Sequence, residues 1–383
     1  MKIVYVTAHY APNIGGVENV VKWQSAGMAR RGHDVAIVTT ALQWPHGRLQ
    51  ALPFEVTNDT HVQIRRLAGV QGTNIGGRSV FYPPANIKKL LGLRGVLREL
   101  KPDVIHVHHL MPGVVRDADW YRATSKTCQL FFQPYFHPYG RLLAHTVRDS
   151  VNRRSVRRAT THGTIVTVNS EEVRQLEHHY GVTVHRSRVI RIPVLWDRAQ
   201  PATTVPDGPA TLLCVARLDE GRKGHAFLLQ GLSRITDLDW RIRLVGRGTG
   251  YEVTRLAKEL GLRDRVQLEG EVTEEALIQL YDSCDVFVMV SQYESYGIPF
   301  VEAMFRGKPV VGTKVGGVPE VVGNAGLLVN YGDTRGLADA LRCVIVDREL
   351  RLSLAQRAYE RSFDFESAGL LDTLENLYRN NST

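Results

Sequence analysis

Two glutamates, Glu294 and Glu302, flank a Gly-Ile-Pro step within residues 291–302, SQYESYGIPFVE. An apolar run before this segment predicts a strand, and the proline suits the first turn of a following helix. Gly297 and Ile298 would then point their N–H groups at a ligand held by the helix N-terminus. Such a position favours a diphosphate, and the two carboxylates suit hydrogen bonds to sugar hydroxyls. Simple complementation of the helix dipole is the alternative for Glu302.

A second segment, VARLDEGRKG at residues 215–224, offers cations that a diphosphate would need. Arg217 follows a predicted strand, and Lys223 precedes a helix expected to begin near Gly224. Both side chains could converge on phosphate oxygens, with Arg222 as a competitor for either role. Taken alone, arginine and lysine in a loop are usually solvated surface residues.

A third segment, HYAPNIGGVE at residues 9–18, joins the first predicted strand to a helix. It lacks the GxGxxG spacing, so it is not a nicotinamide or flavin dinucleotide fingerprint. Gly15 and Gly16 permit close approach of the backbone to an anion, and a tight turn without a ligand is the alternative.

The elements that must position these residues alternate along the whole chain, short β-rich runs with longer helical ones. This alternation predicts α/β architecture, with two Rossmann-like parallel sheets and crossover helices. Strands are expected at residues 2–7, 34–40, 103–108, 128–133, 164–169, 188–192, 210–216, 240–245, 266–268, 286–290, 309–312 and 326–329. Helices are expected at residues 16–31, 86–100, 148–158, 224–235, 251–260, 274–283, 299–306, 334–346 and 363–378.

The 383 residues are enough for two domains that each bury a core. The expected N-terminal domain covers residues 1–198 and the C-terminal domain residues 199–362. Residues 196–209, WDRAQPATTVPDGP, have the composition of an interdomain linker. A final helix within residues 363–383 follows an apparently complete second domain, so it is expected to pack back on the first.

The segments quoted above resemble glycosyltransferase family 4. ESYGIPFVE is similar to the E-x7-E motif of that family, ARLDEGRKG to its phosphate-binding segment, and the loop GGVE to its N-terminal glycine loop. Further similar stretches, DVIHVHH, LVGRG, LEGEVTEEALIQLYDSCDVFV and KPVVGTKVGGVPEVV, occur in the family's order over nearly the whole chain. The sequence departs from the pattern at IPVLWD, residues 192–197, where IPNGVD is usual, and at Tyr296, where Phe is common.

The resemblance implies a GT-B enzyme that faces two Rossmann-like domains across a cleft and transfers a sugar with retention of anomeric configuration, without a metal. Arg217 and Lys223 would neutralise the donor diphosphate. Glu294 would hold hydroxyls of the transferred sugar, and Glu302 those of the ribose. His137, in QPYFHPYG, matches the family's histidine near the reacting sugar.

The resemblance also assigns donor contacts to backbone or small residues, with the base received near residues 270–272. These positions are Gly15, Gly16, Gly246, Val272, Tyr296, Gly297 and Ile298. The implied co-substrate is a nucleotide-diphosphate sugar, with no other cofactor.

Two patterns resemble metal ligands. Asp117 and Asp119 form a DxD sequence, but they lie far in sequence from every phosphate feature, so a surface loop is expected. His106 and His108 fall on one face of a predicted strand and His109 on the other, without a Cys or HExxH partner. We therefore expect structural histidines and no metal site.

The charge is unevenly distributed. Residues 1–200 contain 27 Lys and Arg against 13 Asp and Glu, whereas residues 201–383 contain 21 against 26. The densest basic stretch, RDSVNRRSVRR at residues 148–158, predicts a helix with a cationic face. A solvated surface helix and a surface for anionic lipid or a phosphorylated acceptor both fit this pattern. Nucleic acid is disfavoured, because aromatic residues are not interleaved with the basic ones.

Four scattered cysteines, Cys128, Cys214, Cys284 and Cys343, form no CxxC pair and lie in apolar stretches, which favours buried thiols in a reducing cytoplasm. No secretory signal or membrane-spanning run is evident, so the protein is expected to be soluble or peripheral at the cytoplasmic membrane.

The predicted function is transfer of a hexose from a GDP- or UDP-sugar to an acceptor hydroxyl, on a lipid-linked molecule or a cell-surface glycan. Two other functions are considered: a sugar-nucleotide-binding protein without turnover, and a GT-B sugar-nucleotide epimerase. The first predicts damage at Arg217, Lys223, Glu294 or Glu302, all of which are present. The second needs acids and bases for proton abstraction at the sugar, which we do not identify.

Overall fold

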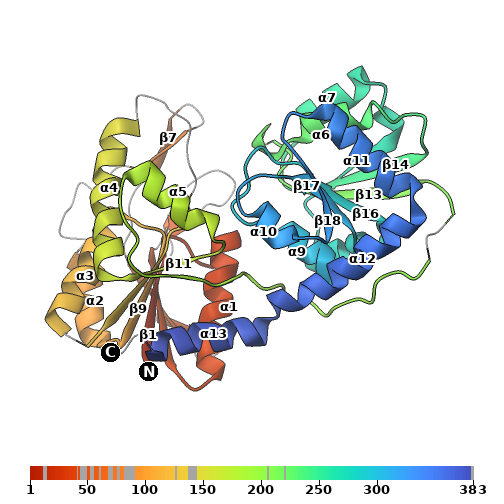
Figure 1. Ribbon diagram of the computed structural model, residues 1–383. Helices are drawn as coiled ribbons and strands as arrows, with labels where there is room; N and C mark the ends of the chain where they lie inside the picture. Colours follow the sequence, from red (N-terminus) through yellow and green to blue (C-terminus); the bar gives the residue numbers. More distant parts are fainter. Residues whose placement is uncertain are drawn as a thin grey trace. The chain divides into compact units, whose positions relative to one another are not determined.

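The computed structural model describes residues 1–11, 15–40, 42–43, 50–51, 56–59, 62–67, 72–75, 78–81, 91–125, 127–136, 145–204, 207–219 and 221–380. The chain divides into two compact units. Unit 1 comprises Met1–Val168, Glu172–Ile190 and Ala368–Thr383, and unit 2 comprises Asn169–Glu171 and Arg191–Ser367. Figure 1 shows the elements of each unit with their labels.

Unit 1 is built on a sheet whose strands are parallel except at one edge. The strand order is β12 (Ser187–Val189), β11 (Thr164–Thr167), β10 (Gln129–Gln133), β9 (Val104–His108), β1 (Lys2–Val6), β2 (Asp34–Thr40), β6 (Val62–Leu67) and β5 (Val56–Asp59). Only β5 runs antiparallel to its neighbour in this sheet. Two short antiparallel pairs lie apart from it, β3 (Leu42–Gln43) with β4 (Gln50–Ala51), and β7 (Gly72–Ile75) with β8 (Arg78–Phe81).

The strands at the centre of this sheet are covered on both faces, which explains their apolar sequences. Every residue of β9 is buried, and so are four of the five in β1. The helices of unit 1 are α1 (Gly16–Arg30), α2 (Leu91–Leu100), α3 (Pro112–Ser125), α4 (His145–His162), α5 (Glu171–Tyr180) and α13 (Ser367–Asn380).

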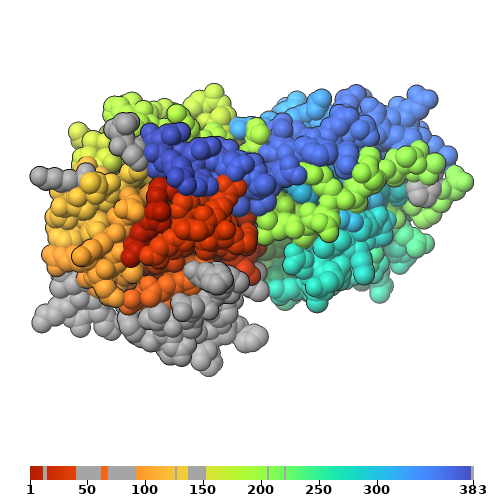
Figure 2. Space-filling view, turned by 90° about the horizontal axis from the view of Figure 1, so that it is seen from below, coloured from red at the N-terminus to blue at the C-terminus, as the bar shows by residue number. Residues whose placement is uncertain are grey.

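Helix α13 is the expected returning helix, and it packs on unit 1. Its buried Tyr378 places its hydroxyl 3.2 Å from that of Tyr5 and 2.6 Å from Nδ1 of His106. Arg31, which follows α1, forms an ion pair with Glu375 at 2.7 Å. Figures 1 and 2 both show this helix lying against the N-terminal elements.

Unit 2 contains a fully parallel sheet. Its strand order is β15 (Val266–Gly270), β14 (Trp240–Val245), β13 (Ala210–Val215), β16 (Val286–Met289), β17 (Val310–Thr313) and β18 (Gly326–Val329). Its helices are η2 (Gly221–Lys223), α6 (His225–Leu232), α7 (Tyr251–Glu259), η3 (Arg263–Arg265), α8 (Glu274–Ser283), α9 (Ile298–Phe305), α10 (Val318–Val322), α11 (Thr334–Val346), α12 (Arg348–Ser362) and η4 (Phe363–Phe365). Fully buried side chains such as Trp240, Leu232 and Phe300 form its core.

The strand order in unit 2 reverses direction between β13 and β16. From β13 the chain adds β14 and β15 on one side, and from β16 it adds β17 and β18 on the other. Loops after the two central strands therefore diverge and leave room for a ligand at the carboxyl edge of the sheet.

Several predicted features need correction. No strand was expected between residues 40 and 103, yet β5 and β6 extend the first sheet there. The stretch taken for a linker belongs to unit 2: Ala199 N–H donates to the carbonyl of Phe305 at 2.9 Å, and Arg198 Nε donates to Ser362 Oγ at 3.1 Å. Of the cysteines, Cys343 is exposed rather than buried.

Candidate functional site

The candidate site of unit 2 lies where β13 and β16 end side by side. The two strands are parallel neighbours, with Leu212 opposite Val286 and Leu213 opposite Phe287. The loop after β13 carries Arg217 and Lys223, and the loop after β16 carries Glu294 and Gly297. The topology thus brings both predicted segments to one edge of one sheet.

Lys223 and Glu294 are in direct contact. The ammonium Nζ lies 2.9 Å from Glu294 Oε2, and the two side chains are 23% and 14% exposed. The main chain makes this contact possible: Gln292 N–H donates to the carbonyl of Arg222 at 2.8 Å. Gly224, with φ of 77°, packs so closely that a Cβ there would lie 2.0 Å from the carbonyl oxygen of Val290.

Gly297 occupies the N-cap of α9 with φ of 88°, in the left-handed region that favours glycine. Within the described residues, the N–H groups of Gly297 and Ile298 donate to no backbone carbonyl. A Cβ at Gly297 would lie 2.7 Å from the ring of Phe300 and 3.4 Å from Cγ of Glu294. The helix N-terminus, with its positive dipole end, therefore lies beside the Glu294 side chain.

Glu302 lies one turn further along α9 and is held by α8. The hydroxyl of Tyr281 donates a 2.8 Å hydrogen bond to its Oε2. Burial raises the pKa of the Glu302 carboxyl to about 7, which the hydrogen bond from Tyr281 partly offsets. A carboxyl with such a pKa changes its charge near neutrality, a property often found in binding sites.

The remaining predicted residues of unit 2 lie around this edge. Arg217 is exposed just beyond β13, and its carbonyl lies 3.1 Å from Nε2 of His225. A Cβ on Gly246 would lie 2.0 Å from the carbonyl oxygen of Ala216, so the loop after β14 touches the chain beside Arg217. Val272 is half-buried between β15 and α8.

Tyr296 is buried, and its hydroxyl is used inside unit 2. It donates to the carbonyl of Ile192 at 3.0 Å and accepts from the N–H of the same residue at 2.9 Å. The aromatic ring thus anchors the segment IPVLWD, and a donor contact at this position would fall to the backbone.

In unit 1, Gly15 has an extended backbone and Gly16 begins α1. A Cβ on Gly15 would lie 2.4 Å from Glu18 Oε2, so the glycine leaves space for that carboxylate to fold back over the helix start. His137 lies outside the described residues.

The histidines of β9 are buried structural groups. His106 and His108 stack with ring centroids 4.6 Å apart, and Nδ1 of His108 lies 2.9 Å from the hydroxyl of Tyr135. Burial lowers the pKa of His106 to about 3 and that of His108 well below its ordinary value. Both rings are therefore neutral at physiological pH.

The DxD sequence does not form the surface loop expected for it. Asp117 and Asp119 are both buried and lie within helix α3. Asp117 accepts from Arg94 Nε at 2.9 Å, and Asp119 lies 2.8 Å from Nδ1 of His162. The two carboxylates therefore link α3 to α2 and α4.

Three structurally important residues escaped the sequence analysis. Asp219 accepts from the N–H groups of Thr249 and Gly250 at 2.9 and 3.1 Å, which fixes the start of α7. Gly316, with φ of 50°, packs against the loop of Glu294, because a Cβ there would lie 1.9 Å from the Glu294 carbonyl oxygen. Asn169 Nδ2 donates to the carbonyl of Ser295 at 2.5 Å. Asp219 lies within the quoted segment VARLDEGRKG and Gly316 within KPVVGTKVGGVPEVV, but the sequence offered no reason to assign a role to either residue.

Solved glycosyltransferase structures share this fold. Sucrose-phosphate synthase from Thermosynechococcus elongatus matches with a TM-score of 0.76 at 20% identity, covering 99% of this chain and 98% of that one. WaaG, a glycosyltransferase involved in lipopolysaccharide biosynthesis, matches with a TM-score of 0.73 at 18% identity over 98% and 99%. Anabaena Alr3699/HepE, solved in complex with UDP-glucose, gives a TM-score of 0.71 at 18% identity over 99% and 100%. The fold is thus that of the GT-B glycosyltransferases.

Similarities in amino-acid sequence indicate the same class of protein as the similarities in fold. Residues 15–194 match the family model "Glycosyl transferase 4-like domain", and residues 209–347 match "Glycosyl transferases group 1". N-acetyl-alpha-D-glucosaminyl L-malate synthase of Bacillus anthracis is 24% identical, covering 96% of this chain and 94% of that protein. D-inositol 3-phosphate glycosyltransferase of Corynebacterium diphtheriae is 27% identical over 99% and 94%. The chain belongs to the family-4-type group 1 glycosyltransferases, and it is a glycosyltransferase of the GT-B type.

Proposed function

We propose that the protein is a retaining, metal-independent hexosyltransferase that uses a GDP- or UDP-sugar as donor. The observation that carries this proposal is the convergence of Lys223, Glu294 and the N-terminus of α9 where the strand order of unit 2 reverses. A diphosphate there would meet an ammonium and free amide N–H groups, and a sugar would meet a carboxylate.

The proposed roles of the residues around the diphosphate follow from the charges that develop during glycosyl transfer. Glycosyl transfer develops positive charge on the sugar and negative charge on the departing diphosphate, so groups that stabilise the latter lower the barrier. Lys223 and Arg217 supply fixed positive charge, and Gly297 and Ile298 supply N–H donors. These groups can stabilise the leaving diphosphate without Mg²⁺ or Mn²⁺.

Glu294 and Glu302 are proposed to hold hydroxyls of the transferred sugar and of the ribose, respectively. Glu294 is held in place by the ion pair with Lys223, and Glu302 by Tyr281. Gly246 and Val272 border the same edge, where close backbone contacts suit a nucleotide base and phosphate. Retention would follow if the acceptor attacks the sugar face that the diphosphate leaves, with a phosphate oxygen taking the acceptor proton.

The acceptor is proposed to carry an anionic group. The two relatives named above are named for D-inositol 3-phosphate and L-malate, both anionic. The excess of arginine and lysine in residues 1–200 suits such an acceptor, or a lipid-linked one at an anionic cytoplasmic membrane surface. None of the helices within the described residues is long and apolar enough to cross a membrane.

The test is a transfer assay with UDP-, GDP-, ADP- and dTDP-sugars against phosphorylated and carboxylated polyol acceptors, with and without EDTA. The expected result is a glycoside whose anomeric configuration, read by NMR, matches that of the donor, and whose rate is unchanged by EDTA. Inversion, or loss of activity on chelation, would contradict the mechanism. Tight donor binding without any transfer would favour the non-enzymic function instead.

A further inference from the structure

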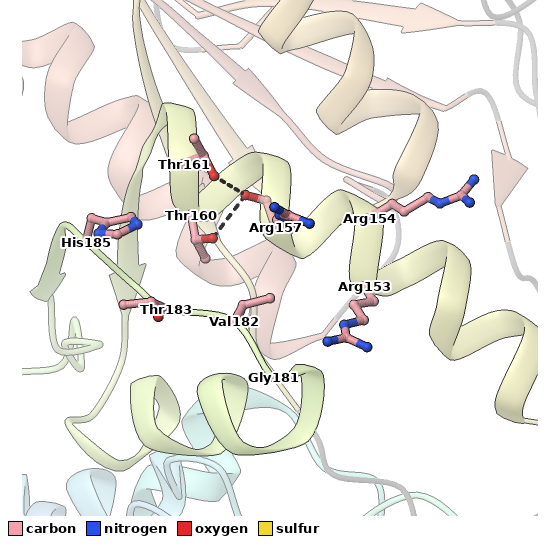
Figure 3. Close-up of a pocket in the computed structure, with 9 residues that line it drawn as sticks. All are labelled: Arg153, Arg154, Arg157, Thr160, Thr161, Gly181, Val182, Thr183 and His185. Atoms are coloured by element: carbon pink, nitrogen blue, oxygen red, sulfur yellow. Dashed lines mark hydrogen bonds between the residues drawn. The ribbon is translucent and has the colours of Figure 1, made fainter.

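A depression of about 800 Å³ lies on unit 1, between helix α4 and the chain that follows α5 (Figure 3). Arg153, Arg154 and Arg157 of α4 line one wall, and His185 lies on the other. None of the residues that line it is acidic. The site already described does not use any of these side chains.

The three arginines are exposed and carry positive charge along one side of α4. Among the side chains that the structure describes, which exclude those of residues 145–151, no carboxylate forms an ion pair with Arg153, Arg154 or Arg157, whereas their neighbour Arg158 approaches Asp119 at 3.4 Å. Spacings of three and four residues put these like charges next to one another on the helix, which destabilises it. A bound anion would relieve that repulsion.

The residue that follows helix α5 is a glycine, which leaves space for the guanidinium group of Arg153. Gly181 has φ of 56°, and a Cβ there would lie 3.2 Å from Nη2 of Arg153. Figure 3 shows Arg153 directed towards Gly181, while Arg154 points away from Thr183 and His185. Arg154 and Arg157 both also line a neighbouring depression with Arg116. Because Arg154 points away, Arg153 and Arg157 are the arginines that remain to bind a ligand in this pocket.

The donors available to a ligand indicate its chemistry. The hydroxyls of Thr160 and Thr161 both donate to the carbonyl of Arg157, at 3.1 and 2.8 Å, so their protons are already in use. The side-chain donors that remain for an anion are the guanidinium groups, His185 and the hydroxyl of Thr183. The N–H groups of a planar guanidinium match the spacing of phosphate oxygens. Two guanidinium groups also balance the double negative charge of a phosphate.

The pocket lies at the opposite end of unit 1 from the glycine loop. The second half of α4 leads into β11, and the segment after α5 leads into β12, so both approach the amino edge of the parallel sheet. Gly15 and Gly16 follow the carboxyl end of β1 and lie at the other edge. A ligand in the pocket would therefore not compete for the glycine loop.

We propose that this pocket is a second anion site, which binds a phosphomonoester or phosphodiester group through Arg153, Arg157 and His185. The phosphate belongs either to a small soluble molecule or to a lipid headgroup, and the same side chains would serve both. The site is separate from the donor site of unit 2, because it shares no residue with it.

The test uses the full chain saturated with UDP, so that the donor site is occupied. Binding of glycerol 3-phosphate is followed by ³¹P NMR, and binding of phosphatidylglycerol vesicles by co-sedimentation against phosphatidylcholine vesicles. Native protein is compared with R153Q/R157Q and with R153K/R157K, which keeps the charge but loses the forks. The matched control is R234Q/R241Q, which removes two exposed arginines from unit 2.

We expect R153Q/R157Q to bind its ligand at least about tenfold more weakly than the native protein and R234Q/R241Q, with R153K/R157K in between. Loss confined to glycerol 3-phosphate identifies a soluble phosphate, and loss confined to vesicles identifies a lipid phosphate. The proposal is overturned if native protein binds neither probe, or if both double glutamine variants lose binding equally. Thermal unfolding checks that each variant is folded.

Discussion

The ammonium of Lys223 lies 2.9 Å from the carboxylate of Glu294, although the two residues follow different strands of the second sheet. The contact joins the predicted phosphate-binding segment to the predicted sugar-binding glutamate. In the proposed site, an incoming diphosphate would share Lys223 with the carboxylate of Glu294, so the lysine would both bind the diphosphate and position the glutamate.

Replacement of this lysine should damage catalysis more than stability. For Lys223→Ala we expect kcat/KM to fall by about 100-fold, because one fixed charge on the leaving diphosphate is lost. The melting temperature should change little, since a partly exposed ion pair stabilises by at most about 1 kcal/mol. Steady-state kinetics and thermal unfolding test both statements. The matched control is Arg342→Ala, which breaks an exposed ion pair with Asp237 in the same unit, and equal loss of kcat/KM in both variants would count against the site.

Glu302 should make the stability of the protein depend on pH in a predictable direction. Burial raises its pKa from 4.5 to about 7, so the folded protein holds the proton more tightly than the unfolded chain does. Its ionisation therefore costs stability progressively as the pH rises through this interval, and the cost is complete above the folded-state pKa.

The variant Glu302→Gln removes this ionisation but keeps an acceptor for the hydroxyl of Tyr281. We expect the free energy of unfolding of the variant, relative to the native protein, to rise by at most about 3 kcal/mol between about pH 4.5 and pH 8. Urea unfolding of both proteins at several pH values measures the difference. Burial also raises the pKa of Glu172 to about 7. Because both proteins contain Glu172, its contribution to the pH dependence of stability cancels in the difference between them. A difference independent of pH would contradict the prediction.

The turn at Gly297 should tolerate no side chain without loss of donor binding. Alanine there would be strained at φ of 88° and would crowd the Phe300 ring, so we expect destabilisation of about 1–3 kcal/mol and weaker binding of UDP or GDP. Gly261→Ala provides the control, because its φ of 70° carries the same strain with nothing within 4 Å of the added Cβ. Calorimetric titration of both variants should show weaker nucleotide binding only for Gly297→Ala.

One buried hydroxyl group, that of Tyr378, should contribute measurably to the packing of helix α13 on unit 1. Tyr378→Phe removes the buried partner of His106 and Tyr5, and we expect it to cost about 1–3 kcal/mol of stability. Tyr359→Phe removes an exposed hydroxyl that accepts from Gln200, so it should cost much less. Thermal unfolding compares the two, and equal effects would show that the buried hydroxyl is not important for docking.

The parallel sheets and the returning helix could be predicted because buried strands leave apolar runs with clear ends. Residues 34–40 were predicted as a strand, and β2 has the same bounds. Strands β5 and β6 were missed because the charged and polar residues of VTND and VQIRRL hide the pattern at the edge of the sheet. Asp117 and Asp119 were misjudged for a related reason: their burial depends on arginines and a histidine from other helices.

Within the candidate site, the sequence indicated which residues could take part but not which ones touch. The contact of Lys223 with Glu294 depends on Gly224 packing against Val290, a long-range approach that no local pattern reports. Similarly, the pairing of Tyr296 with the backbone of Ile192 depends on how the start of unit 2 folds over its own core. The sequence therefore indicates candidate residues for the site, but not the contacts between them.

Unit 1 is assembled from both ends of the polypeptide, and this has a consequence for biosynthesis. Helix α13 emerges from the ribosome only after the whole of unit 2, so the pocket that receives Tyr378 stays vacant during most of translation. The packing of α13 on unit 1 therefore has to follow the synthesis of unit 2, whereas unit 2 can bury its core earlier. A nascent chain stalled before residue 368 would expose the stacked histidine face of β9 to chaperones and proteases.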